Sequence, residues 1–397
     1  MQSDQYGPAP ASTASSPGSA QPSSAQQSAI PFVRASRKAS QQDFAQPGLT
    51  LSAATQQIGP FDIQTNGFLR YLELYVSQTA AGNAATVAYA ADAPFNVLQN
   101  ITLQDPSSEF IISPYSGYEL YLAEKYFGYL ANPPASDIRT DPNYLATAGS
   151  GATGGSFAFP IRVPLEDRVR DAFGAVPNSA ANKNYRLQCF VAPSATVFTT
   201  PPTTPAPNLQ VACTNFYWTE PPPSIAGAPC VPTPNGNGTV CYLDREVFTN
   251  LTSQNNPTLI LKNVGRVYKN VLFILRNASG ARISGTDWPD PASLWVNGFP
   301  LYYKPKHSWL TQMADDYEFT GTPGTFDVAN GLDTGVFAWS DLCSQPGSVT
   351  NWGPADQYLP TVPSTKIQLV GNFGVNASSM VVLQRTIKPS SGAALFG

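Results

Sequence analysis

Hydrophobic and polar residues alternate along much of the chain from residue 48 onward. In GFLRYLELYV (residues 67–76), Phe68, Leu72 and Leu74 fall on one face of an extended segment, and Tyr71 and Glu73 fall on the other. A period of two is typical of a β-strand. The same reasoning predicts strands in NVLQNITLQD, EFIIS, FAFPIRVPL, YRLQCFVA and LQVACTNFYW. The prolines in FAFPIRVPL predict a sheet edge or a bulge.

Residues 113–130, SPYSGYELYLAEKYFGYL, follow a helical period instead. Ser116 followed by Glu119 is a capping-box pattern, and Gly128 suits the end of a helix. Apolar side chains line two faces of this segment. One face carries Tyr118, Leu122, Tyr126 and Tyr129, and the other carries Leu120, Ala123 and Phe127. We predict a helix that buries more than one side within a chain that is otherwise all-β.

The order of elements in the first half of the chain returns in the second half. The offset is roughly 180–200 residues, which suits a duplicated domain and not a solenoid repeat. The parallel segments are GFLRYLELYV and GRVYKNVLFIL, ITLQDPSSEFIISPYSGYELYLAEKYF and LWVNGFPLYYKPKHSWLTQMADDY, FAFPIRVPL and GVFAWSDL, and NYRLQCFVAP and TKIQLVGNFG. A second short helix is predicted to open on Ser308, with Leu310, Met313 and Tyr317 on one face.

The N-terminal segment, residues 1–47, is rich in Ser, Ala, Gln and Pro. Such a composition buries little apolar surface, so a flexible arm is predicted. Arg34, Arg37 and Lys38 form a basic patch in this arm. The patch suits an anionic membrane, a neighbouring subunit or plain solvent.

Two further segments interrupt the strand pattern. Residues 221–240 are rich in proline and predict a semi-rigid linker between two domains. Residues 131–155 predict a long loop, which in a compact domain is usually functional or mobile. Residues 391–397 are expected to form a C-terminal tail.

Composition argues against several functional classes. The 397 residues carry a net charge of −4 and show no Lys/Arg stripe, which argues against nucleic-acid binding. Charged residues make up 12% of the chain, against about 25% in a typical protein, so much of the surface is expected to be buried in contacts. No apolar run approaches the roughly 20 residues of a membrane span, and the N-terminus lacks a signal-peptide pattern. We expect a chain made and used without export.

Candidate catalytic residues are few. A Ser-His-Asp triad would have to combine His307, the single histidine, with Ser308 and Asp315 or Asp316. Ser308 fits a helix N-cap better, and the two acids fit a solvated helix face, so no catalytic site is predicted. The GxGxxG pattern in GSGATGG (residues 149–155) precedes a strand-like segment, whereas a phosphate-binding loop needs a helix there. A flexible loop is predicted.

Metal sites are weakly indicated. Asp287 with Asp290, or Asp315 and Asp316 with Glu318, have the carboxylates that Ca²⁺ prefers. No EF-hand spacing accompanies them. We therefore expect neither a metal nor a cofactor.

The remaining candidate sites each have a structural alternative. Cys230 and Cys241 flank a turn-rich segment and would close a small disulfide loop, whereas free thiols are the default in a chain made in the cytoplasm. Sequons such as those at Asn100 and Asn376 reflect composition if the chain is not exported. Five tryptophans either stack on sugars or, as we expect, fill cores and interfaces. They are Trp288, Trp295, Trp309, Trp339 and Trp352.

Two β-rich halves in tandem, each with a short helix before its later strands, resemble the double jelly-roll major capsid proteins. The similarity is to those of tectivirus-like, membrane-containing tailless bacteriophages and the adenovirus-hexon lineage. It covers residues 48–390 and depends on the order of GFLRYLELYV, SGYELYLAEKYF and FAFPIRVPL, then GVFAWSDL and TKIQLVGNFG. It implies an all-β fold of two tandem eight-stranded jelly-roll sandwiches, residues 48–220 and 241–390, each with a short helical insertion.

The resemblance also implies a non-enzymatic role in a virion. A homotrimer would form a pseudo-hexameric block that tiles an icosahedral shell and contacts vertex (penton) and minor capsid proteins. The N-terminal arm would lie near an internal lipid membrane, and loops 131–155 and 343–363 would face outward. The alternative function is a secreted-type two-domain β-sandwich that binds or hydrolyses carbohydrate. That alternative needs a signal peptide and a polar cleft, and a third, a phage fibre, needs fibrous repeats.

A helix that occurs once in each half is more typical of architecture than of a unique ligand site. We therefore expect residues 113–130 to be wedged between their own sandwich and the adjoining sandwich or subunit.

Overall fold

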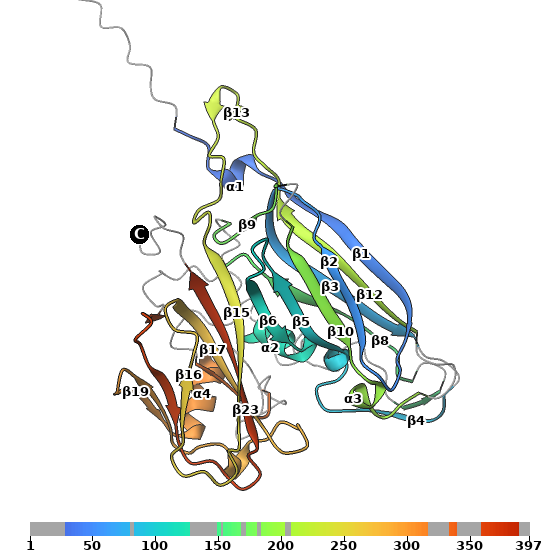
Figure 1. Cartoon of the computed structure of the whole chain (residues 1–397), viewed down its shortest axis with the longest axis vertical. Helices are drawn as coiled ribbons and strands as arrows, with labels where there is room; N and C mark the ends of the chain where they lie inside the picture. Colours follow the sequence, from blue (N-terminus) through green and yellow to red (C-terminus); the bar gives the residue numbers. More distant parts are fainter. Residues whose placement is uncertain are drawn as a thin grey trace, which may run out of the picture.

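The computed structural model describes residues 28–79, 83–127, 149–151, 154–167, 172–180, 184–202, 208–316, 333–339 and 359–388. These residues form two β-sandwiches that lie side by side (Figure 1). Among them, no helix is long and apolar enough to cross a bilayer.

The first sandwich has two four-stranded sheets. One has the order β1-β12-β3-β8, formed by Lys38–Thr50, Asn208–Trp218, Phe68–Thr79 and Phe157–Pro164. The other has the order β2-β10-β5-β6, formed by Gln56–Asp62, Arg186–Val191, Leu98–Gln104 and Phe110–Tyr115. A short strand, β9 (Val176–Pro177), also pairs with β3. Strand β8 lies at the end of its sheet, which confirms the edge position predicted from its prolines.

The second sandwich repeats this plan. The sheet β15-β23-β17-β20 is formed by Val240–Thr249, Ser379–Lys388, Val267–Arg276 and Val336–Trp339. The sheet β16-β22-β18-β19 is formed by Thr258–Leu261, Ile367–Val370, Ala292–Val296 and Phe299–Lys304. Strand β21 (Leu359–Pro360) pairs with β17.

Both sandwiches have one strand order. If the eight strands of each are numbered along the chain, one sheet reads 1-8-3-6 and the other 2-7-4-5 in both halves. This arrangement of antiparallel strands in two sheets is the jelly roll. The predicted fold of two tandem eight-stranded jelly rolls is thus confirmed.

Smaller elements decorate the sandwiches. Strands β4 (Asn83–Tyr89), β7 (Gly149–Gly151) and β11 (Phe198–Thr200) form a separate sheet at one end of the first sandwich. The short helices are α1 (Phe32–Ala35) and α3 (Ser194–Val197), with 3₁₀ turns at Phe95–Val97 and Gly285–Asp287.

Helix α2 (Gly117–Tyr126) follows β6 in the first sandwich. Its capping box is confirmed, because Ser116 Oγ accepts from the Glu119 amide at 3.2 Å and Glu119 Oε2 accepts from the Ser116 amide at 2.7 Å. All of its residues are buried, which agrees with the two predicted apolar faces. Gly128 lies outside the described residues.

Helix α4 (Lys306–Asp316) follows β19 at the equivalent place in the second sandwich. It begins two residues earlier than predicted, so Ser308 lies inside the first turn and is not the N-cap. The Lys306 amide donates instead to Asp290 Oδ1 at 2.9 Å, a carboxylate that satisfies one of the free amides at the helix start. Leu310 and Met313 are buried as predicted, and Tyr317 lies outside the described residues.

The predicted arm, residues 1–47, extends too far. Residues 38–47 belong to β1, which pairs with β12 from Lys38↔Trp218 to Thr50↔Asn208. A polar sequence serves an edge strand well, since its backbone hydrogen bonds need no apolar side chains. Residues 1–27 lie outside the described part of the chain.

The segment predicted as a linker, residues 221–240, has local structure. Strands β13 (Ser224–Ile225) and β14 (Ala228–Pro229) form a hairpin, and Cys230 makes a β-bridge to Ile30. The second sandwich begins with β15 at Val240.

Candidate functional site at the junction of the two sandwiches

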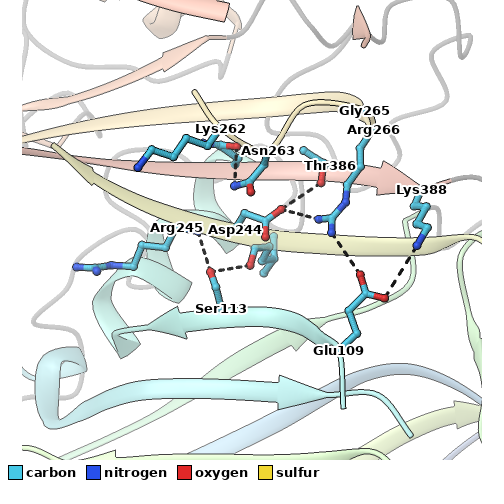
Figure 2. Close-up of polar contacts among 12 residues, drawn as sticks. Glu109, Ser113, Asp244, Arg245, Lys262, Asn263, Gly265, Arg266, Thr386 and Lys388 are labelled. Atoms are coloured by element: carbon cyan, nitrogen blue, oxygen red, sulfur yellow. Dashed lines mark hydrogen bonds and ion pairs between the residues drawn. The ribbon is translucent and has the colours of Figure 1, made fainter. Parts of the chain in front are cut away.

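A direct strand contact joins the two jelly rolls. Strand β6 of the first sandwich lies parallel to β15 of the second, with Ile112 opposite Leu243, so that one sheet continues through both halves. Ser113 Oγ accepts from the Arg245 amide at 2.7 Å and donates to the Leu243 carbonyl at 3.2 Å (Figure 2). Tyr115 Oη donates to the Asp244 carbonyl at 3.0 Å.

Arg266 links charged groups beside this strand contact. Its Nη1 donates to Asp244 Oδ2 at 2.8 Å, and its Nη2 lies 3.4 Å from Glu109 Oε1 of the first sandwich (Figure 2). Lys388 Nζ lies 4.0 Å from the other Glu109 oxygen. Burial raises the pKa of Asp244, and the Arg266 charge offsets part of that rise.

Helix α2 makes a second contact, with Asp333 of the second sandwich. Lys125 Nζ lies 2.7 Å from Asp333 Oδ2, and the hydroxyls of Tyr118 and Tyr126 each donate to this carboxylate at 3.0 Å. All four side chains are buried. Burial by itself raises the pKa of Asp333, but the charges of Lys125 and Arg282 and the hydrogen bonds outweigh it, so the pKa lies below its ordinary value.

Asp92 is a carboxylate of the first sandwich that pairs with two cations of the second. Arg276 Nη1 and Arg282 Nε each lie 2.7 Å from its carboxylate. The Arg282 guanidinium also stands over the Tyr118 ring, 4.9 Å from the centroid. Glu119 extends the same set of contacts, since Arg245 Nε lies 2.9 and 3.0 Å from its two carboxylate oxygens.

A third buried group gathers around Asp167 of the first sandwich. Lys269 Nζ and Arg385 Nη2 approach Asp167 Oδ1 to 2.8 and 2.7 Å. Arg385 Nη1 donates to the Phe127 carbonyl at the end of α2, and Arg385 Nε donates to Cys241 Sγ at 3.3 Å. Burial raises the pKa of the Cys241 thiol, although the Arg385 charge partly counters it.

These groups fix one relative position of the two jelly rolls. A buried ion pair adds little net stability, because desolvation offsets its attraction, but removal of one partner leaves a buried charge and is costly. In the pairs Lys125–Asp333, Arg276–Asp92, Arg245–Glu119 and Lys269–Asp167 the carboxylate and the cation come from opposite halves, so a shifted docking would leave several charges unpaired. The junction therefore acts as a structural joint, and Asp92, Glu119, Arg245 and Arg276 also line a cavity of about 550 Å³ beside it.

The sequence did not reveal these pairs, because their members lie far apart along the chain. Lys125 and Asp333 are 208 residues apart. A usable signal was nonetheless present. Glu119, Glu124 and Lys125 stand within a helix that is otherwise apolar, where charged residues are rarely buried unless they are paired.

The candidate triad is not assembled by the described side chains. His307 and Ser308 lie exposed on the first turn of α4. The side chains of Asp315 and Asp316, and all of Glu318, lie outside the described set.

The glycine-rich segment is partly a strand and not wholly a loop. Gly149–Gly151 forms β7 and pairs with β4, which supplies the backbone partners that a loop would lack. The segment leads into β8, so no helix N-terminus follows it. The remainder of loop 131–155 lies largely outside the described residues, as does most of loop 343–363.

The described candidate calcium ligands, Asp287 and Asp290, accept hydrogen bonds from backbone amides. Asp287 Oδ1 accepts from the Asn376 amide at 2.9 Å, and Asp290 caps α4. Within the described residues, no group of three or more His, Cys, Asp or Glu side chains is arranged to bind a metal.

The cysteines and tryptophans have structural surroundings. Cys230 and Cys241 are free thiols, so the disulfide does not form. Trp288, Trp309 and Trp339 are buried, and the Trp288 ring stacks on Phe337 at 3.7 Å, which confirms the core interpretation for these three. Trp295 is partly exposed, and Trp352 lies outside the described residues.

Comparison with known proteins identifies the fold. No family model and no curated protein matches the sequence. The crystal structure of the STIV MCP matches with a TM-score of 0.55 at 15% identity, over 88% of this chain and 96% of that one. The quasi-atomic model of the PBCV-1 virus capsid matches with a TM-score of 0.56 at 11% identity, over 89% and 93%. The Faustovirus major capsid protein matches with a TM-score of 0.50 at 9% identity, over 89% and 90%.

These likenesses extend over almost the full length of each chain. At such low identities they show a shared fold. The protein therefore has the double jelly-roll fold of viral major capsid proteins, and the resemblance inferred from the sequence is confirmed at the level of fold. The tectivirus-like subgroup stays a prediction.

Proposed function

We propose that this protein is the major capsid protein of a virus and that it assembles as a homotrimer. Three chains supply six jelly rolls, which form a pseudo-hexameric block of an icosahedral shell. The observation that carries this proposal is the junction of β6, α2 and β15, which fixes two jelly rolls of one strand order side by side. A shell assembled from pairs of jelly rolls needs such a rigid pair.

Two other observations support a structural role. The charged fraction of 12% leaves much surface suited to burial in contacts. The strongest cluster of charges lies in the junction, where the carboxylates are paired with cations.

The proposal extends to partners inside a virion. Trimers would contact one another and the vertex and minor capsid proteins. Arg34 and Arg37, both exposed, precede β1 and would approach an internal membrane from the arm. A liposome flotation assay with anionic vesicles tests this contact. A chain that lacks residues 1–37 should float less than the full chain, and equal flotation would contradict the membrane contact.

The mass of the protein in solution tests the assembly unit. We expect a species near three times 42.4 kDa, and hexagonal blocks or shells by electron microscopy. A chain that stays monomeric at high concentration and binds glycans would overturn the proposal in favour of the carbohydrate-binding alternative.

A further inference from the structure

Two sheet edges differ between the halves in a way that suggests a missing neighbour. Strand β6 lies between β5 and β15, so neither of its edges is free. Its counterpart β19 lies at the end of its sheet, next to β18. Likewise β15 has β6 beside it, whereas its counterpart β1 lies at the end of its sheet. The other two edges, β2 and β8, match edges in the second half, β16 and β20, so they need no such explanation.

The side chains show the same difference. Phe110–Tyr115 and Phe299–Lys304 can be compared by position, since each strand has six residues and precedes its helix by one residue, although each pairs irregularly with its neighbouring strand. Ile111, Ile112 and Tyr115 of β6 are buried, whereas no residue of β19 is buried and Leu301, at the position of Ile112, is 47% exposed. The first residue is exposed in both strands, since Phe110 is 46% exposed. Phe299 and Tyr303, two residues to either side of Leu301, are 76% and 69% exposed. These three are exposed apolar side chains of one edge strand, and together they are called the β19 face.

Helix α4 continues this surface. When Gly117 of α2 is aligned with Lys306 of α4, the buried residues Tyr118, Glu119 and Leu122 match His307, Ser308 and Thr311, which are exposed. In α2 these positions touch the second sandwich or its surroundings, as the contacts of Tyr118 with Asp333 and of Glu119 with Arg245 show.

We infer that the β19 face and the exposed side of α4 bind the β1 edge of a second copy of this chain. The contact repeats the internal junction, with β19 in the place of β6 and the β1 of the other copy in the place of β15. This inference rests on the proposed homotrimer and names the surfaces that form it. β19 lies at the lower left and β1 at the right of the molecule in Figure 1, so each copy presents two different surfaces, as a ring closed by rotation requires.

Sequence differences between the two contacts fit this assignment. The internal junction is formed during folding; Tyr118 contacts Asp333 across it, and Leu122, one turn later on the same side of α2, is buried. The outer surface is exposed until a second copy binds, and it carries His307 and Thr311 at those positions. Polar residues there keep the unassembled chain soluble, while the β19 face supplies the apolar contact.

The first test is a charge on the β19 face. We expect Leu301→Asp/Tyr303→Asp to raise the concentration for half-maximal trimer formation at least about tenfold, because two unpaired carboxylates would be buried in the contact. The readout is native mass across a dilution series, with circular dichroism as the check on folding. The matched control is Val362→Asp/Val375→Asp, at two other exposed valines of the second sandwich, which should form trimers like the wild type.

The second test identifies the partner strand. One tagged chain carries Leu301→Cys and another carries Gln42→Cys, an exposed residue of β1, in a background of Cys230→Ser/Cys343→Ser. After co-expression, a short bifunctional maleimide should join the two differently tagged chains, and Val375→Cys in place of Leu301→Cys should not give that product.

The outcomes separate the two proposals. A wild-type chain that remains monomeric overturns the homotrimer and with it this contact. A wild-type trimer that forms equally well from Leu301→Asp/Tyr303→Asp, or that gives no Leu301→Cys to Gln42→Cys product, overturns the contact alone.

Discussion

Helices α2 and α4 occupy equivalent places in two jelly rolls of one strand order, yet their surroundings differ. The residues of α2 are buried throughout, and the helix contacts both sandwiches. Helix α4 buries Trp309, Leu310 and Met313 against its own sandwich and leaves its opposite side exposed. The same element thus serves once as a joint between sandwiches and once as an outer surface.

Glu124 and Met313, at matching positions of α2 and α4, show how similarly the two helices pack on their own sandwiches. Glu124 of α2 accepts from the Arg162 amide of β8 at 2.7 Å through Oε1. Met313, at the matching position of α4, accepts from the Ala338 amide of β20 at 3.3 Å through its sulfur. Each side chain thus receives a backbone amide from the corresponding strand of its sandwich, although one is a carboxyl and the other is apolar.

The place of a helix in the jelly roll thus determines how it packs on its own sandwich. The adjoining sandwich or chain determines which residues suit the opposite side of the helix. Substitutions at matched positions in the two helices separate these contributions.

The largest effect is expected from Leu122→Asp. Leu122 is fully buried in the joint, so the variant places an unpaired charge there and should prevent stable folding or assembly. The matched Thr311→Asp lies on the exposed side of α4 and should change the free energy of unfolding of the unassembled chain by no more than about 0.5 kcal/mol. Chemical denaturation measures both effects. A Leu122→Asp variant that folds and assembles would contradict the placement of α2 between the two sandwiches.

Lys125→Met should cost about 3–5 kcal/mol of unfolding free energy, because it leaves the Asp333 carboxylate buried without its nearest cation. Adding Asp333→Asn should restore part of the loss, since that change removes the unpaired charge. Urea unfolding of the two single variants and the double variant gives the coupling energy. Strictly additive losses would show that the pair does not join the sandwiches.

Glu124→Gln should change how stability depends on pH. Burial raises the pKa of Glu124 to about 8, although the Arg162 charge and amide lower it in part. The folded chain therefore keeps a proton that the unfolded chain loses above its ordinary pKa, so the wild-type free energy of unfolding falls as pH rises toward 8. In the variant, the free energy of unfolding should not show this decrease. The variant should therefore be more stable than the wild type at pH 8, by on the order of a few kcal/mol, but not at pH 4.

Thermal unfolding between pH 4 and pH 8 measures this dependence. Glu220→Gln, at an exposed carboxyl, is the control and should follow the wild type. If Glu124→Gln keeps the wild-type slope, Glu124 is ionised in the folded chain and the argument fails.

The smallest effect is expected from Ser116→Ala. Loss of the N-cap should reduce the free energy of unfolding by about 1 kcal/mol. Ser308→Ala in α4 should have less effect, because α4 begins at Lys306 and Ser308 does not cap it. An equal loss of unfolding free energy in both variants would support the predicted N-cap at Ser308.

Strands with one buried face were predictable, because their alternation is visible in the sequence. Strand β3 and the strands that match the quoted segments belong to this group. Strand β1 was missed because its polar residues need only backbone pairing. Strands β15 and β23 carry Asp244, Arg245 and Arg385, which are residue types ordinarily exposed to solvent, and these charges are used in the junction.

The start of α2 was predicted correctly and the start of α4 was not, because only the first depends on residues that are close in sequence. The start of α2 depends on a local pattern, Ser116 and Glu119, and local patterns can be read from a sequence. The start of α4 depends on Asp290, which the fold brings from before β18. The charged contacts of the junction likewise join residues that only the tertiary structure brings together.

The covalent connection between the sandwiches has a consequence for assembly kinetics. Tethering gives the two jelly rolls of one chain a high effective concentration, so the contact between β6 and β15 forms at any dilution. A contact between chains must instead overcome the loss of translational and rotational entropy, and it depends on the supply of chains. In the proposed homotrimer, half of the contacts between neighbouring jelly rolls would therefore form during folding, and the concentration of chains would set when the other half form.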